Sequence, residues 1–257
     1  MAAAAAMGLE GIGITDHDTT APFEVARAAA DAAGIDVVLG TEFSAEELGL
    51  SVHVLGYWID PSYEPLAGEL DRLRDERTDR ARRIVERFHG LGIPIAFERV
   101  QQLAAGAPIG RPHLAAAVVE LGAAASTREV FDRYLADGGP AYVSKHAVSP
   151  ERAVELLVAA GGVAVLAHPG LYGDRTGAQG LPPSVIERMC AVGLAGIEAD
   201  HPDHTAEHRV RYRDLAVALD LAVTAGSDHH GRGVEDRLGR ATTPRHVVEE
   251  LRRWRVA

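Results

Sequence analysis

Cysteine and lysine are nearly absent from this sequence, and it has no long apolar run. The one cysteine, Cys190, lies in an apolar helical pattern, so no internal disulfide can form and we expect a buried core thiol. A chain with this cysteine usage needs no oxidising compartment, and we expect it in the cytoplasm. The opening segment MAAAAAMG has no basic stretch before its alanines and is too short for a membrane span, which predicts a helix and no membrane association.

The overall charge is strongly negative. A formal net charge of -11 argues against a broadly basic nucleic-acid surface, although it permits a local cationic pocket that holds phosphate. The arginine-rich stretch DRLRDERTDRARRIVERF mixes its basic residues with acids. We interpret it as a solvated helix with Glu76–Arg80 and Asp79–Arg83 pairs rather than as a nucleic-acid site. With 257 residues, of which 47% are hydrophobic, the chain is typical of a soluble globular protein.

Short apolar runs alternate with amphipathic helical patterns at both ends of the chain. This alternation is typical of α/β folds built from parallel βα units. Candidate strands are residues 11–15, 36–42, 51–57, 163–167, 196–199 and 222–225, and candidate helices are 22–33, 150–160, 183–191, 204–219 and 246–254. Residues 61–149 show helical patterns and no convincing strand, which predicts an all-helical insertion domain within a body formed by residues 1–60 and 150–257.

Carboxylates and imidazoles follow most of these strands. They are Asp16, His17, Asp18, Glu42, His168, Asp200, His201, Asp228, His229 and His230. The third strand is the exception, because its histidine, His53, lies inside the strand. The carboxyl ends of parallel strands meet at one rim, where residues that do chemistry collect. Imidazole and carboxylate without thiolate form a ligand set for Zn, Mn or Fe(II), and they favour metal-assisted hydrolysis.

Seven short motifs occur in order along the chain: ITDHDT, GTEFS, HVLGYW, GRPHLA, VAVLAHPG, GIEADHPDH and GSDHHG. Together they resemble the PHP (polymerase and histidinol phosphatase) superfamily, and most of all its branch of RNase AM and 3′,5′-nucleoside bisphosphate phosphatases. The resemblance spans essentially the whole chain. It implies an α/β fold, a distorted TIM-like (β/α)7 barrel with a helical insertion. It also implies a centre of up to three divalent metal ions, usually Mn, with Zn or Fe as alternatives.

The resemblance also implies roles for particular residues. The implied metal ligands are His17, Glu42, His53, His168, Asp228 and His230, with Glu42 bridging two ions. Arg111 and His113 of GRPHLA would face the substrate phosphate, and Lys145 and His204 are further candidates for substrate binding. For Lys145 the alternative is a surface amine. Asp16 and Asp18 are expected to orient the turn around His17 rather than to bind metal.

One feature of the superfamily is missing from the sequence. Its members begin with a strand that ends in H-x-H and is followed by an aspartate. This chain opens instead on an alanine-rich segment that resembles the tail of the helix after that strand. We expect the natural protein to begin roughly 20 to 30 residues upstream, since one strand, one turn and most of a helix need that length. The alternative is a degraded relative of low activity.

The resemblance predicts a metal-dependent phosphoesterase. The expected substrate is a nucleoside 3′,5′-bisphosphate or the 5′ end of a short phosphorylated RNA, and the expected reaction is in-line attack of hydroxide on phosphorus. Glu42, Arg111 and His113 are the expected catalytic residues, because the metals and the two basic side chains would neutralise charge on the phosphoryl oxygens. A non-catalytic nucleotide-binding module and a histidinol-phosphate phosphatase are the alternatives. No obligate protein partner is expected.

Overall fold

The computed structural model describes residues 1–47, 49–106, 109–136, 138–143, 147–172, 180–230 and 237–255. The chain divides into two compact units. The first is formed by Met1–Glu69 with Ala147–Ala257, and the second by Leu70–His146. None of the helices in the described ranges combines the length and the apolar character that crossing a membrane requires.

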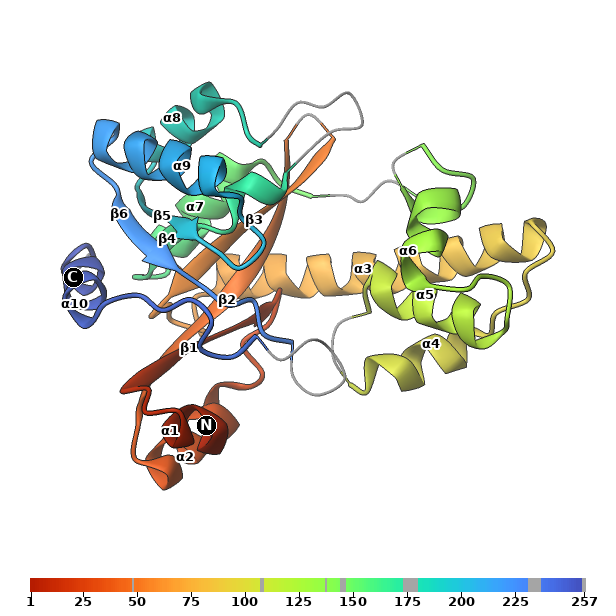
Figure 1. Ribbon diagram of the computed structural model, residues 1–257, viewed down its shortest axis with the longest axis horizontal. Coiled ribbons are helices and arrows are strands. Elements are labelled where there is room, and N and C mark those ends of the chain that lie inside the picture. Colours follow the sequence, from red (N-terminus) through yellow and green to blue (C-terminus); the bar gives the residue numbers. More distant parts are fainter. Residues whose placement is uncertain are drawn as a thin grey trace. The chain divides into compact units, whose positions relative to one another are not determined.

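A mixed six-stranded sheet forms the centre of the first unit (Figure 1). Its strands are β1 (Gly11–His17), β2 (Asp36–Glu47), β3 (Leu50–Tyr57), β4 (Val163–Leu166), β5 (Leu194–Asp200) and β6 (Ala222–Ala225), and they lie in this order across the sheet. The pairs β1–β2, β4–β5 and β5–β6 are parallel, whereas β3 is antiparallel to both neighbours. The α/β class is therefore confirmed. The pairings between described strands do not join β6 to β1, so the closed barrel with a missing first strand stays a prediction.

The direction of β3 decides which of its residues reach the carboxyl ends of the neighbouring strands. Because β3 runs against β2 and β4, the start of β3 lies beside the ends of those two strands. His53 pairs with Ser44 of β2, and its carbonyl accepts a hydrogen bond from the amide of Ala167, directly after β4, at 3.1 Å. His53 therefore reaches the same edge as the strand-end residues, although it lies inside its own strand.

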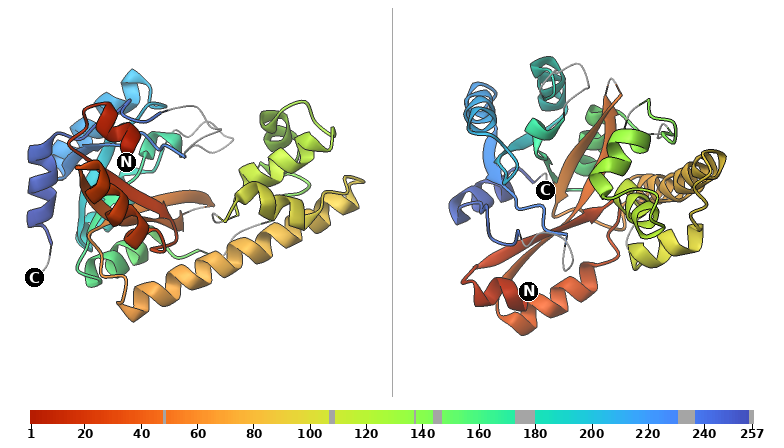
Figure 2. Two further views of the ribbon diagram at one scale, coloured as in Figure 1. Left: turned by 90° about the horizontal axis from the view of Figure 1, so that it is seen from below. Right: turned by 45° about the vertical axis from the view of Figure 1, so that its right-hand side comes forward.

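Helices follow most strands of the first unit, as the hydrophobic pattern predicts. They are α1 (Ala2–Ala6), α2 (Phe23–Ala33), α7 (Pro150–Ala159), α8 (Pro183–Ala191), α9 (Ala206–Ala218) and α10 (Arg245–Arg253), with a short 3-10 turn at Pro169–Leu171. Ser149 and Thr205 precede α7 and α9, and each side chain accepts a hydrogen bond from an amide of the first turn. α1 lies beside α2, and α10 lies beside β6 (Figure 2).

Both faces of the sheet are covered by apolar side chains. All four residues of β4 are buried. Phe43 of β2, Leu157 of α7 and Ile186 of α8 are at most 1% exposed, and Leu251 of α10 packs against Val165 of β4. Burial of a side chain of this size contributes about 1.5–3 kcal/mol, so these contacts supply much of the free energy that holds the strand ends in place.

Cys190 lies at the end of α8 and is half-buried, which corrects the expectation of a fully buried thiol. The buried row of α8 consists of Val185, Ile186 and Met189. One further residue along the helix turns the side chain by about 100°, toward the flank of this row. Burial raises the pKa of the Cys190 thiol, so the group is not activated as a nucleophile.

The second unit contains helices and no strand among its described residues. α3 (Glu64–Gly90) leads into it, and α4 (Phe97–Ala104), α5 (Arg111–Glu120), α6 (Thr127–Val130) and a π-helical turn (Phe131–Leu135) follow. Their buried faces form a separate hydrophobic core around Phe88, Leu114 and Val118. A core of this kind lets a segment fold as a compact body of its own.

Gly40→Ala should push β3 away from β2. A Cβ atom at Gly40 would lie 2.3 Å from the carbonyl oxygen of Gly56, which belongs to the backbone of the partner strand and cannot rotate away. We expect the free energy of unfolding to fall by about 1–3 kcal/mol, as at other overpacked sites, when measured by urea denaturation. Gly13→Ala in β1 is the matched control, because its Cβ would meet only Tyr57 at an ordinary 3.5 Å. Equal urea midpoints for the two variants would contradict this expectation.

Candidate metal centre

The carboxylate of Glu42 lies at the centre of the strand ends and is buried. His53 Nδ1 lies 2.7 Å from Glu42 Oε1, and His168 Nε2 lies 3.2 Å from the same oxygen. His17 Nε2 lies 3.6 Å from the other oxygen, Oε2. Three imidazoles therefore surround one buried carboxylate.

Strand register brings these side chains together. His17 ends β1 and pairs with Glu42 in the parallel β2, while His53 arrives from the antiparallel β3. The ring centroids of His17 and His53 are 4.8 Å apart, and those of His53 and His168 are 5.2 Å apart. The four side chains thus come from four adjacent strands or from the turn that directly follows one of them.

Asp228 and His230 follow β6 and adjoin this group. The ring of His230 lies 6.4 Å from that of His17, between centroids. His230 Nδ1 donates a hydrogen bond to the backbone oxygen of Asp228 at 3.0 Å, and the negative charge of Asp228 acts on His168. The six residues that the resemblance implies as metal ligands are therefore at one edge of the sheet, and their role as ligands stays a prediction.

Three residues at this edge have a left-handed backbone, namely Asp18, His168 and Asp228, with φ values of 50, 26 and 47°. In non-glycine residues such conformations cost about 1–3 kcal/mol and persist only where neighbouring contacts hold them. Asp18 Oδ1 accepts a hydrogen bond from the amide of Ser44 at 2.8 Å, and the Asp18 amide donates to the carbonyl of Glu42 at 3.0 Å. Asp18 therefore orients the turn at the end of β1.

Burial and charge together set the protonation of the group. Burial alone would raise the pKa of Glu42, but the charges of His17 and His53 and a hydrogen bond to His168 outweigh it and hold that pKa well below its usual range. Burial lowers the pKa of His53 to about 3. Burial alone would lower the pKa of His168, but the hydrogen bond to Glu42 and the charge of Glu42 outweigh it and raise the pKa of His168. The group thus offers an ionised carboxylate and a neutral imidazole to a cation.

These donor atoms fit a divalent metal ion. One ligand atom from each of His17, Glu42 and His53 lies within 4.8 Å of the others. Nδ1 of His168 is buried and has no hydrogen-bond partner in the part of the chain that the structure describes, a state that usually marks an unfilled interaction. Imidazole nitrogens and a carboxylate oxygen without thiolate suit Zn, Mn and Fe(II) alike.

No family model matches the chain. Curated relatives do match it, and the two described next are both named as enzymes that act on phosphate esters. The chain is 35% identical over 86% of its length to the 3′,5′-nucleoside bisphosphate phosphatase of Chromobacterium violaceum, of which the alignment covers 77%. It is 37% identical over 85% of its length to the 5′-3′ exoribonuclease Rnm of Escherichia coli, of which 74% is covered.

A solved structure agrees with these relatives. It is described as a metal-dependent phosphoesterase from Bifidobacterium adolescentis, and it superimposes with a TM-score of 0.90 at 34% identity, over 99% of this chain and 89% of that one. The chain belongs to this family of phosphoesterases. Membership agrees with the resemblance of its motifs to the PHP superfamily.

Glu198 adjoins the candidate metal centre, although it does not lie at a strand end. It is buried within β5, and its Oε2 accepts a hydrogen bond from the amide of His168 at 3.0 Å. A Cβ atom at Gly226 would lie 1.8 Å from Glu198 Oε1, so the loop after β6 packs directly on this carboxylate. Burial raises the pKa of Glu198 to about 7. The available signal was an acid inside the apolar run GIEAD, because acids are rarely buried without a role.

Tyr172 joins two strands of the phosphoesterase site. Its hydroxyl donates a hydrogen bond to the carbonyl of Ala167 at 2.7 Å and accepts one from the amide of His53 at 2.8 Å. Burial raises the pKa of Tyr172 well above its usual range, so the hydroxyl keeps its proton. Tyr172 therefore holds the backbone beside His168 against β3, and no local sequence pattern marks this role.

The polar residues at the end of β5 have structural roles in the phosphoesterase. Asp200 forms an ion pair with Arg213. His204, a candidate for substrate binding, is buried, and its Nδ1 donates to the carbonyl of Ala199 at 2.8 Å while its Nε2 accepts from the amide of Gly170 at 3.1 Å. Both ring nitrogens of His204 are thus bound to the backbone, so we do not include this residue in the proposed substrate site.

The candidate phosphate-binding residues lie in the second unit, at the start of α5. His113 Nδ1 accepts a hydrogen bond from the amide of Gly110, the residue before the helix, at 3.0 Å, so Nε2 carries the proton of the neutral ring. Arg111 Nη1 donates to the carbonyl of Leu135 at 3.3 Å, which orients the guanidinium. Lys145 lies outside the described residues.

Glu42→Gln should weaken the binding of divalent metal. The amide keeps the shape of the side chain but removes the negative charge among the imidazoles, and we expect the affinity for Mn²⁺ to fall by about 100-fold or more in isothermal titration calorimetry. Glu47→Gln is the matched control on the same strand, because Glu47 is paired with Arg188 instead. Equal Mn²⁺ affinity in wild type and Glu42→Gln would rule out a metal at this carboxylate.

His201 should make the metal-free protein less stable in acid. Burial lowers its pKa to about 4 in the folded chain, against an ordinary value of 6.5 in the unfolded chain. Above pH 6.5 the ring of His201 is neutral in both the folded and the unfolded chain. As the pH falls toward 4, only the unfolded state takes up the proton, so stability is lost across this window by up to about 1.4 kcal/mol per pH unit.

Urea unfolding at pH 7 and pH 5 should therefore show a smaller loss of unfolding free energy for His201→Gln than for wild type. His246→Gln, at an exposed position of α10, is the control and should behave as wild type. A loss in His201→Gln as large as that in wild type would show that His201 does not cause the acid sensitivity.

Proposed function

We propose that this phosphoesterase hydrolyses phosphate esters of nucleotides in a metal-dependent reaction. It would act as a 3′,5′-nucleoside bisphosphate phosphatase, as a 5′-to-3′ exoribonuclease on short 5′-phosphorylated RNA, or as both. The observation that carries the proposal is the buried carboxylate of Glu42 among the imidazoles of His17, His53 and His168. The names of the two relatives and of the structural neighbour support this choice of substrate and cofactor.

The metal would be held by residues at the carboxyl edge of the sheet. We propose His17, Glu42, His53, His168, Asp228 and His230 as its ligands, and Mn as the ion among those that accept such donors. A bound divalent ion supplies charge that polarises phosphoryl oxygen and makes water easier to deprotonate. The side chains contribute their ionisation states, because Glu42 is held as a carboxylate and His53 as a neutral ring.

Arg111 and His113 would hold the phosphate of the substrate. A planar guanidinium can donate two parallel hydrogen bonds to a phosphate. The capping hydrogen bond from Gly110 leaves the proton of His113 on Nε2, which makes that atom a hydrogen-bond donor to a phosphoryl oxygen. Both groups would stabilise the charge that develops on these oxygens in the transition state. Lys145 is a further candidate on its motif alone.

Two alternatives predict different behaviour. A non-catalytic module would bind nucleotides without turnover, and a histidinol-phosphate phosphatase would act on an amino-alcohol phosphate. The helical insertion with its GRPHLA motif favours the nucleotide enzymes. The cytoplasmic location and the lack of an obligate protein partner stay predictions.

Turnover should depend on Mn²⁺ and on Glu42. With Mn²⁺ present, the protein should release phosphate from adenosine 3′,5′-bisphosphate or mononucleotides from a 5′-phosphorylated oligoribonucleotide, as measured by phosphate assay and gel electrophoresis. Removal of the metal with EDTA, or Glu42→Ala, should reduce turnover to background, because the carboxylate that holds the cation is lost. Undiminished activity in Glu42→Ala would refute the proposed centre, and binding without turnover in wild type would favour the non-catalytic module.

Arg111→Gln tests the proposed phosphate site within the same assay. We expect KM for the bisphosphate to rise by about tenfold or more, because a charge-assisted bidentate contact is lost. Arg128→Gln is the matched control in the same unit, since this arginine is largely exposed and forms a long ion pair with Asp132, at 4.0 Å. Equal KM values in the two variants would remove Arg111 from the substrate site.

A further inference from the structure

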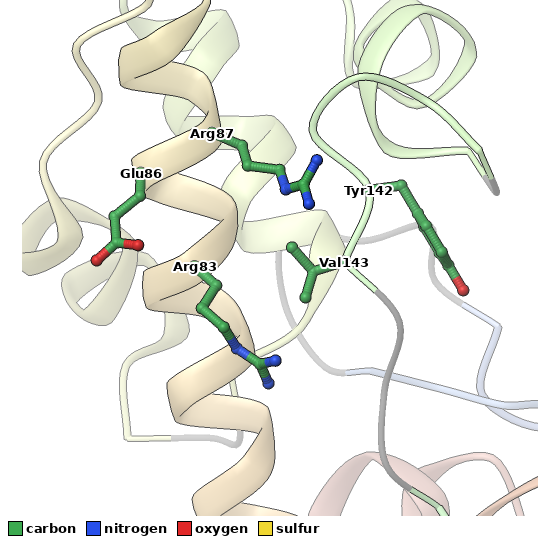
Figure 3. A pocket seen from close by; sticks show the side chains of 5 residues that line it. All are labelled: Arg83, Glu86, Arg87, Tyr142 and Val143. Atoms are coloured by element: carbon green, nitrogen blue, oxygen red, sulfur yellow. The ribbon is translucent and has the colours of Figure 1, made fainter.

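The second unit carries a pocket of its own. Its volume is about 650 Å³, and it is lined by Arg83, Glu86, Arg87, Tyr142 and Val143 (Figure 3). In Figure 3 the guanidinium groups of Arg83 and Arg87 point from α3 toward the side on which Tyr142 lies, whereas the carboxylate of Glu86 points to the opposite side of the helix. The side of the pocket that faces Tyr142 is therefore cationic and aromatic.

Arg80 joins the segment with Tyr142 to α3. Its Nε donates a hydrogen bond to the carbonyl of Val143 at 2.7 Å, and its guanidinium carbon lies 5.8 Å from the centroid of the Tyr142 ring. Arg80, Arg83 and Arg87 are separated by three and four residues, which places them on one face of the helix over about 10 Å. One face of α3 thus presents a row of guanidinium groups beside an aromatic ring.

One ion pair on α3 differs from those that the sequence predicts. Glu76 pairs with Arg83, and Asp79 pairs with Arg82 rather than with Arg83. Arg80 donates a hydrogen bond to a backbone carbonyl of the pocket wall. The side of α3 that faces the pocket therefore contacts the pocket wall, and the interpretation of this stretch as a solvated helix stays a prediction.

Arg87 is exposed and has no hydrogen-bond or ion-pair partner among the residues that the structure describes. The nearby pair of Arg83 with Glu76 is half-exposed, and pairs of this kind are weak enough to exchange for a stronger anion. The chain has 37 acidic and 26 basic residues, so intramolecular partners for an arginine are plentiful. The guanidinium of Arg87 is therefore available to an anionic ligand in the pocket.

We propose that this pocket binds one nucleotide of single-stranded RNA, with Arg83 and Arg87 on a phosphate and Tyr142 stacked on the base. Guanidinium groups match the geometry of phosphate oxygens. A cationic groove beside an aromatic ring holds single strands without reading their sequence. An acidic peptide could use the guanidinium groups, but it has no flat base to stack on the Tyr142 ring. Binding here needs no hydrolysis, so this site goes beyond the proposed function.

The test is a binding measurement without turnover. A fluorescein-labelled, 5′-phosphorylated oligoribonucleotide of eight adenosines is titrated with the protein in EDTA, and fluorescence anisotropy is followed at several NaCl concentrations. Arg83→Gln combined with Arg87→Gln should weaken binding by about tenfold or more and reduce the salt slope by roughly 0.7, the contribution of one phosphate on a single strand. Tyr142→Leu should weaken binding by about tenfold, whereas Tyr142→Phe keeps the ring and should bind as wild type.

Matched controls distinguish RNA binding at this pocket from nonspecific electrostatic attraction between RNA and the protein. Arg74→Gln combined with Arg128→Gln removes the same charge from the same unit, at arginines that are paired with Asp71 and Asp132. This control should bind the oligoribonucleotide as wild type does. A poly-glutamate peptide of equal charge should compete at least tenfold more weakly than unlabelled RNA.

The assignment would be overturned by no binding in wild type, by equal weakening in the control double variant, or by equal loss in Tyr142→Leu and Tyr142→Phe. Equal competition by poly-glutamate would make this a general anion site and would also overturn the nucleotide assignment. Since EDTA excludes turnover, failure here is distinguishable from failure of the proposed hydrolysis, which is measured separately with Mn²⁺.

Discussion

The electrostatic coupling between Glu42 and its surrounding imidazoles is the interaction on which the rest of the site depends. The histidines hold the pKa of Glu42 low, and Glu42 in turn raises the pKa of His168, so the ionisation of each side depends on the other. Burying an unpaired carboxylate costs desolvation free energy, and a neighbouring cation offsets that cost. In the metal-free chain hydrogen bonds from His168 and His53 reduce this cost. A divalent metal binds deprotonated ligands and would take over that role.

Groups that do not bind metal keep the donors in position. Asp18 closes the turn after β1, Tyr172 bonds to the backbone on both sides of the β3–β4 seam, and Glu198 holds the amide of His168. Two of the residues around which these contacts gather, Asp18 and His168, have left-handed backbones that need such support. Buried hydrogen bonds around the centre therefore determine its geometry together with the candidate ligands themselves.

The two units contribute different chemistry. The sheet unit supplies anionic and neutral donors suited to a cation, whereas the helical unit presents arginines and a histidine suited to phosphate. Each unit has its own hydrophobic core, so each set of side chains is held by packing within its own body. This division is consistent with the proposed roles, metal binding at the strand ends and phosphate binding on the helices, and with the rule that function lies in sites placed on a fold.

Local patterns in the sequence determined the elements and the donors. The six strands and the helices around them follow from apolar periodicity, and donors expected at strand ends pointed to His17, Glu42 and His168, because these signals depend only on near neighbours. The predicted end at Glu42 was wrong, since β2 continues to Glu47 and Glu42 lies inside it. Only the tertiary structure decided that β3 runs antiparallel, that all three histidines meet one carboxylate, and that Glu198 is buried behind them. Strand direction and register are set by hydrogen bonds and packing between residues far apart in the chain, so patterns among near neighbours do not determine them. For the burial of Glu198 the local signal is limited to an acid inside an apolar run, which does not say what the carboxylate contacts.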